Sequence, residues 1–136
     1  MFNDREQIRK TYLAAWQKHL AKQPLSGLET QLVELILLHP EYQSFFENPD
    51  DDLQHNYRTD NNPFLHLGLH LGIREQLATN RPAGIREIFT KLMQKHQDQH
   101  QVEHLMMDVM ANILWEAQQS NALPDEALYL ERLKAL

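Results

Sequence analysis

The feature that most constrains the fold of this chain is the absence of a sustained strand pattern. β-Branched residues do not alternate with polar ones over any long stretch, whereas leucine, methionine, glutamine, glutamate and alanine, all good helix formers, dominate. A chain of 136 residues fits one hydrophobic core. The sequence therefore predicts an all-α fold: a compact single-domain helical bundle over residues 1–136, with about four longer helices and one or two short ones.

Capping residues and prolines set the expected helix boundaries. Asn3 with Glu6, and Ser26 with Glu29, have the spacing of capping boxes. Asp98 should cap the helix that follows it, Pro124 with Asp125 should start the last one, and prolines should end or open several helices. The expected helices cover residues 3–22, 26–39, 62–79, 83–96, 98–120 and a short segment from 124. Residues 48–61 are polar, have no helical apolar period and are predicted to form a long loop.

Charge and composition exclude several classes of function. The net charge is −6, and basic residues form no strong stripe, so general nucleic-acid binding is not expected. The absence of cysteine excludes disulfides, thiolate zinc sites and cysteine nucleophiles. The opening segment MFNDREQIRK lacks the apolar core of a signal peptide, and no apolar stretch approaches the roughly 18 residues of a membrane span. We therefore expect a cytoplasmic protein that does not enter a membrane.

The segment NPFLHLGLHLGIREQ, residues 62–76, places two histidines inside a leucine-rich helix. His66 and His70 are four residues apart, so both imidazoles lie on one apolar face, on adjacent turns. Gly68 and Gly72 point in another direction, where we expect another backbone to approach closely.

A second polar stripe lies on the helix expected at 98–120. His100, His104 and Asp108 follow one another at intervals of four residues. Three His-x-x-x-His pairs occur in the chain, where chance would give roughly half of one, and this spacing suits a metal ion. His104-x-x-x-Asp108 resembles a fragment of a hemerythrin-like ligand set, although the complete ordering is missing and the ferritin signature Glu-x-x-His is absent.

These patterns lead to a first hypothesis of a metal-binding helical bundle. The candidate ligands are His66, His70 and His104, completed by His39 and Asp108. Glu103 is a candidate base or a partner that orients a ligand. Imidazole and carboxylate without thiolate suit iron, zinc or manganese.

The segment HQVEH, residues 100–104, also matches the inverted zinc-peptidase motif. This short helical chain offers no peptidase scaffold or substrate groove, so the match alone does not indicate an enzyme. Whether the protein catalyses a reaction stays open, and no catalytic residue is assigned.

Two alternatives stand beside the metal hypothesis. Interior histidines often donate to a carboxylate or a carbonyl, which would suit a non-catalytic interaction or scaffold protein with a protein partner. A nucleic-acid adaptor using Arg81, Arg86, Lys91 and Lys95 is opposed by the net charge. Both tryptophans, Trp16 and Trp115, have core spacing and are predicted to pack in the interior.

Five segments resemble the signature blocks of a short bacterial family catalogued only as a domain of unknown function. They are HPEY at 39–42, NPFLHLGLHLGIREQ at 62–76, RPAGIRE at 81–87, VEHLMMDVM at 102–110 and LWEAQQS at 114–120. The resemblance implies an all-helical single domain and brings no established activity. It also implies that relatives often carry histidine where this chain has Gln43, which argues against Glu41 and Gln43 as site members.

Overall fold

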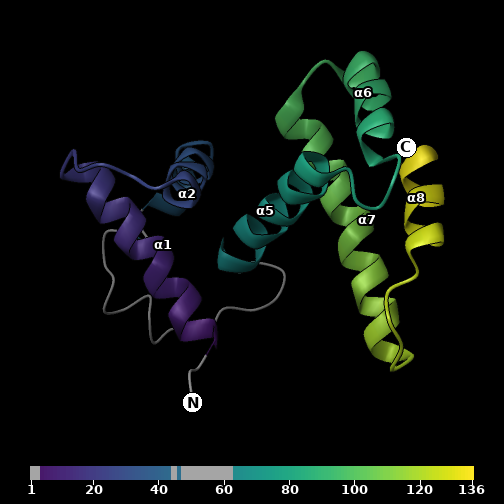
Figure 1. Ribbon diagram of the computed structural model, residues 1–136, viewed down its shortest axis with the longest axis horizontal. Coiled ribbons are helices and arrows are strands. Elements are labelled where there is room, and N and C mark those ends of the chain that lie inside the picture. Colours follow the sequence, from purple (N-terminus) through teal and green to yellow (C-terminus); the bar gives the residue numbers. More distant parts are fainter. Residues whose placement is uncertain (1–3, 44–45, 47–62) are drawn as a thin grey trace. The chain divides into compact units, whose positions relative to one another are not determined.

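The computed structural model describes residues 4–43, 46 and 63–136, and within them the fold is all-α, as predicted. The elements are α1 (Asp4–Leu20), α2 (Gly27–Leu37), the 3₁₀ turn η1 (Pro40–Tyr42), α5 (Pro63–Thr79), α6 (Ile85–His96), α7 (Gln99–Gln119) and α8 (Glu126–Lys134) (Figure 1). The predicted cap at Asn3, the start of the third helix at Asn62 and the predicted loop at 48–61 lie outside the described residues.

The chain divides into two compact units, Met1–Gly68 and Leu69–Leu136. The boundary falls inside α5, so this helix contributes its first turns to one unit and the rest to the other. The single domain expected over residues 1–136 stays a prediction.

In the first unit, α1 packs against α2. The Ser26 hydroxyl accepts from the amide of Glu29, and the Glu29 carboxylate accepts from the amide of Ser26, so the predicted capping box is present. Lys18 from α1 donates to Glu29 at 2.8 Å. The ring of Tyr12 on α1 lies 5.7 Å from that of Phe64, so aromatic contacts join α1 to the start of α5.

In the second unit, apolar side chains from all four helical segments form one buried cluster. α7 packs against α6 and α8, and Ile73 supplies the contribution of α5. The cluster comprises Ile73, Ile85, Ile88, Leu92, Val102, Met106, Met107, Met110, Ile113, Tyr129 and Leu133. Because these residues recur at helical spacing, one face of each helix is buried and the other stays exposed.

Local signals place the remaining helix ends. Asp98 caps α7 by accepting from the amides of His100 and Gln101, and Asp125 caps α8 by accepting from Leu128, at the predicted positions. Arg86 donates through Nε to the carbonyl of Leu77 at 2.6 Å, so this basic residue satisfies an acceptor at the end of α5. Among the described helices, none is both long and apolar enough to cross a membrane.

Two sequence predictions are corrected. An added Cβ at Gly72 would meet the Met110 side chain at 3.3 Å, and at Gly68 it would meet the Tyr12 hydroxyl at 4.0 Å, so side chains rather than a backbone approach these glycines. The prediction that Trp115 packs in the core is wrong, because 60% of it is exposed. It lies about 140° around α7 from the buried Met110. Trp16 is only 3% exposed, as predicted.

Candidate metal centre

His39 is held where α2 ends, and the helix end itself explains its orientation. The last carbonyls of a helix have no partner within it. One of them, from Leu35, lies 2.7 Å from His39 Nδ1 and accepts its hydrogen bond. Pro40 then prevents the helix from continuing and starts η1. His39 is therefore only 2% exposed and its ring is fixed by the backbone of α2.

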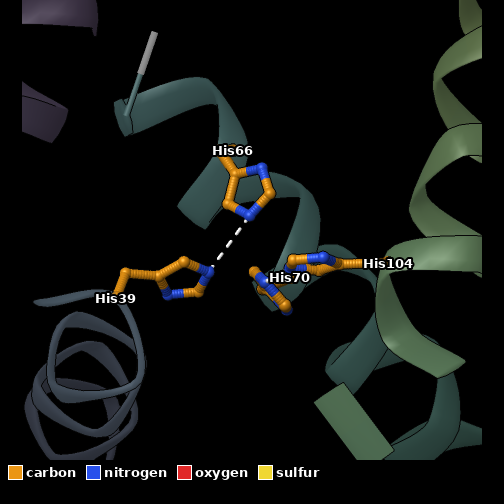
Figure 2. Close-up of side chains that lie close together, drawn as sticks. All are labelled: His39, His66, His70 and His104. Atoms are coloured by element: carbon orange, nitrogen blue, oxygen red, sulfur yellow. Dashed lines mark hydrogen bonds between the residues drawn. The ribbon is translucent and has the colours of Figure 1, made fainter. Parts of the chain in front are cut away.

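His66, on the first turns of α5, faces His39 within the first unit. Their Nε2 atoms are 3.1 Å apart, and Figure 2 shows this contact as a dashed line between the two rings. Tyr42 stacks on His39 with ring centroids 5.2 Å apart and an interplanar angle of 8°, and its ring meets His66 edge to face. The aromatic contacts restrict both rings of this pair, which we call the first histidine pair.

His70 and His104 form a second histidine pair within the second unit, and Figure 2 labels both rings. His70 is fully buried on α5, and its Nε2 lies 3.1 Å from Nε2 of the half-buried His104 on α7. Its Nδ1 lies 2.8 Å from Oε1 of Glu103. The residue before His104 therefore orients the ring opposite His104.

Glu103 is a buried carboxylate with three donors. Besides His70, Arg74 donates to its Oε1 at 3.2 Å and Gln99 to its Oε2 at 2.8 Å. Burial by itself would raise the pKa of Glu103, but the hydrogen bonds from His70 and Gln99 and the charge of Arg74 together lower it below its ordinary value. The side chain is thus an anion at neutral pH, and both of its oxygens are occupied.

These contacts fix the proton on one ring of each pair. A carbonyl and a carboxylate can only accept, so Nδ1 of His39 and Nδ1 of His70 each carry a hydrogen. In the neutral form of each ring, Nε2 then has a lone pair that points at the Nε2 atom of its neighbour. This arrangement, with Nδ1–H held by a protein oxygen and no hydrogen on Nε2, is the one that metal-binding histidines adopt.

The sequence-predicted residues divide accordingly. His39, His66, His70 and His104 are the members of the group of described residues whose nitrogens could hold a metal ion. Glu103, predicted as a base or as a partner that orients a ligand, accepts a hydrogen bond from His70. Asp108 is exposed and does not belong to this group. Asp108 lies about 140° around the axis of α7 from Glu103, and Glu103 is on the side of the helix that His70 contacts.

The peptidase motif at 100–104 is not arranged for hydrolysis. Its histidine rings, His100 and His104, have centroids 4.2 Å apart. Its glutamate, Glu103, instead receives hydrogen bonds from His70, Arg74 and Gln99. A carboxylate engaged by three donors is a poor base for a water molecule.

Three contributors were missed by sequence reasoning. The carbonyl of Leu35 belongs to the backbone, and only the expected end of this helix before Pro40 could have indicated it. Arg74 donates to Glu103 from a different helix, and no spacing in the sequence indicates this contact. Gln99 precedes Glu103 by four residues, a spacing that does favour such a side-chain contact.

Comparisons with known proteins give one match. Neither the curated proteins nor the solved structures that were searched contain a match to the chain. Residues 4–135 match the family described as Domain of unknown function (DUF1841), and this range includes every residue of both histidine pairs. Because the match covers nearly the whole length, the chain belongs to the DUF1841 family.

Proposed function

We propose that this protein binds a divalent transition-metal ion through Nε2 of His39, His66, His70 and His104. The helix α5 supports the proposal because it carries one ring of each pair, His66 and His70, four residues apart. Positions at this spacing differ by about 6 Å along the axis and share one face.

The observation that carries the proposal is the matched orientation of His39 and His70. Two unrelated oxygens, one from the backbone and one from a carboxylate, hold Nδ1–H of these rings. Both leave Nε2 facing a second imidazole nitrogen at 3.1 Å. Two nitrogens bound to one zinc at about 2.0–2.1 Å would be roughly 2.9–3.4 Å apart, for angles between 90° and tetrahedral. Both separations fall in this range.

The donor set favours zinc or iron over manganese. All four candidate donors are imidazoles, which suit zinc and iron, whereas manganese prefers carboxylate and water oxygens. The carboxylate expected from Asp108 is exposed on α7 and lies outside the group. Four protein nitrogens would fill a tetrahedral zinc site, as in sites where the metal supports the fold rather than catalysis.

The test is metal content after purification without chelator, measured by elemental analysis. We expect close to one equivalent of zinc or iron in the wild type, and its loss when His66 and His70 are both replaced by alanine. His96→Ala is the matched control, because His96 ends α6 and is not a member of the group. The wild type containing no metal, and showing no thermal shift with zinc or iron, would overturn the proposal.

A second candidate is a non-catalytic interaction protein in which the histidines are structural. It is favoured by the exposed apolar side chains near the end of α7, namely Leu114, Trp115 and Leu123. Gel filtration and a pull-down would test it. A strict monomer without a partner, filled with metal, would count against it.

A further inference from the structure

A small pocket lies in the second unit, where residues from the end of α5, the second half of α7 and the start of α8 meet. Its volume is about 270 Å³, and its apolar lining includes Pro82, Met110, Ile113, Leu114 and Pro124. This volume is below the roughly 300–1,000 Å³ of typical small-molecule sites. The pocket therefore suits a protruding side chain better than a drug-sized ligand.

The uncharged polar side chains of the pocket already have partners within the protein. Gln76 accepts a hydrogen bond from the Tyr129 hydroxyl at 2.7 Å and donates to the sulfur of Met110 at 3.5 Å. These contacts join α5, α7 and α8, so the lining is held in place before anything enters the pocket. Because these polar groups are satisfied, the pocket favours an apolar occupant.

Beside this pocket the chain presents an exposed leucine. Leu123 is 90% exposed and directly precedes Pro124, which lines the pocket. The link that carries Leu123 is fixed at both ends, because the Ala122 amide donates to the Ala117 carbonyl at 2.9 Å and Asp125 caps α8. A large apolar side chain is thus held in solvent next to a pocket that suits one.

Two charges of opposite sign border the same pocket. Arg81 and Glu126 both line it, and both are exposed. Among the described residues, neither side chain has a hydrogen-bond or ion-pair partner. In a two-fold dimer a surface meets an identical surface, so a projecting side chain has to lie beside the pocket that receives it, and ion pairs need both signs of charge. The pocket, Leu123, Arg81 and Glu126 together meet these requirements, and we call them the self-complementary patch.

We propose that the self-complementary patch is the interface of a two-fold dimer of this chain. Leu123 of each copy enters the pocket of the other, and Arg81 of each copy pairs with Glu126 of the other. A patch centred on one pocket suits a reversible dimer rather than an obligate one. The interface uses the second unit alone and no histidine, so it does not depend on metal binding.

The first experiment measures the dimer by sedimentation velocity over a wide range of protein concentrations, with and without a metal chelator. We expect a monomer–dimer equilibrium in the wild type that the chelator leaves unchanged. Leu123→Asp should raise the dissociation constant at least about 10-fold, the scale of an interface hot spot. Leu20→Asp is the matched control and should leave the constant unchanged, because Leu20 is 59% exposed but lies on α1, outside the patch.

The second experiment tests the charge pair between the copies. Arg81→Glu and Glu126→Arg should each weaken the dimer, because each substitution places like charges opposite one another across the interface. An equal mixture of the two variants should form a heterodimer. In that dimer the new glutamate of one variant faces the new arginine of the other, and the two unaltered residues also form a pair. Neither variant alone carries both signs of charge at these positions, so only pairing between copies can give this result.

Each outcome decides the proposal. A wild type that stays monomeric at every concentration overturns it, and the patch then serves a different occupant. A dimer that Leu123→Asp leaves intact, or that the chelator dissociates, uses another surface and also overturns it. If Leu123→Asp dissociates the dimer but the two charge variants do not associate when mixed, the two-fold pairing of Arg81 with Glu126 is wrong.

Discussion

The two units support their histidine pairs by different means. In the first unit a backbone carbonyl, that of Leu35, orients His39, and nothing in that contact is charged. In the second unit the carboxylate of Glu103 orients His70 and is itself held by Arg74 and Gln99. The same ring orientation is thus reached once through helix geometry and once through an ionic network.

This difference determines how easily a side-chain substitution can change the orientation of each histidine pair. A backbone acceptor survives every side-chain substitution that preserves α2, so the first pair should be robust and hard to tune. The second pair depends on three side chains, any of which can be changed. A carboxylate beside a ligand histidine also raises the basicity of the ring, so the second unit should control metal affinity.

The largest expected contrast is in the stability of the metal-free protein. His70→Ala removes a hydrogen bond to a buried anion, worth about 1.5–3 kcal/mol, whereas the bond lost in His39→Ala is neutral and worth about 0.5–1.5 kcal/mol. Both variants also lose packing of a buried ring. Urea unfolding followed by circular dichroism should therefore show His70→Ala as the less stable, and the reverse order would contradict the comparison.

The next contrast is in metal affinity. Glu103→Gln should weaken zinc binding about 10–100-fold, the usual effect of removing a partner that orients a ligand histidine. Glu75→Gln is the matched control, because Glu75 is exposed on α5 near His70. Competition with a chromophoric chelator measures both constants. Equal affinities for the two variants would show that Glu103 does not support the site.

A smaller effect is expected at the caps of the supporting helices. Ser26→Ala removes the hydroxyl that caps α2, and Asp98→Ala removes the carboxylate that caps α7. Each should cost about 1 kcal/mol of stability. Thermal unfolding of the metal-free protein measures this cost. A loss of several kcal/mol in either variant would mean that the cap does more than begin its helix.

The smallest expected effect is on the stability of the protein at low pH. The hydrogen bond from Lys18, with that from the Ser26 amide, lowers the pKa of Glu29 below its ordinary value of 4.5. A group whose pKa is lower in the folded state stabilises it above the unfolded pKa and loses this contribution as pH falls through the folded pKa. Below pH 4.5, Glu29→Gln should therefore lose stability less steeply than the wild type. If the stabilities of the two proteins fell equally with pH, Glu29 would make no pH-dependent contribution to the stability of the fold.

Much of the fold follows from local rules that the sequence displays. Ser26, Asp98 and Asp125 cap helices where their spacing predicted, because a cap depends only on neighbouring residues. Helical periodicity also placed His66 and His70 on one face. Trp115 shows the limit of periodicity as a guide to burial. Periodicity tells which residues share a face of a helix, but not which face packs against the core, and Trp115 is exposed.

The sequence likewise predicted the residues of the candidate site from local spacing, but not all of their contacts. Intervals of four residues predicted His66, His70 and His104 as candidate ligands, and His39 was predicted to complete them; these four make up the group of described histidines that could hold a metal ion. Asp108 fits the interval equally well but lies on the exposed side of α7. Arg74 and Glu103 are 29 residues apart in the sequence, and only the packing of α5 against α7 within the second unit brings them together.

X-ray absorption of the zinc-loaded protein tests the central claim most directly. If His39, His66, His70 and His104 all bind through Nε2, the spectrum should show four nitrogen neighbours at about 2.0–2.1 Å with the outer-shell scattering of imidazole rings. Replacing His66 and His70 together by alanine should abolish that spectrum. A first shell composed mainly of oxygen, or a protein that retains no zinc, would contradict the account.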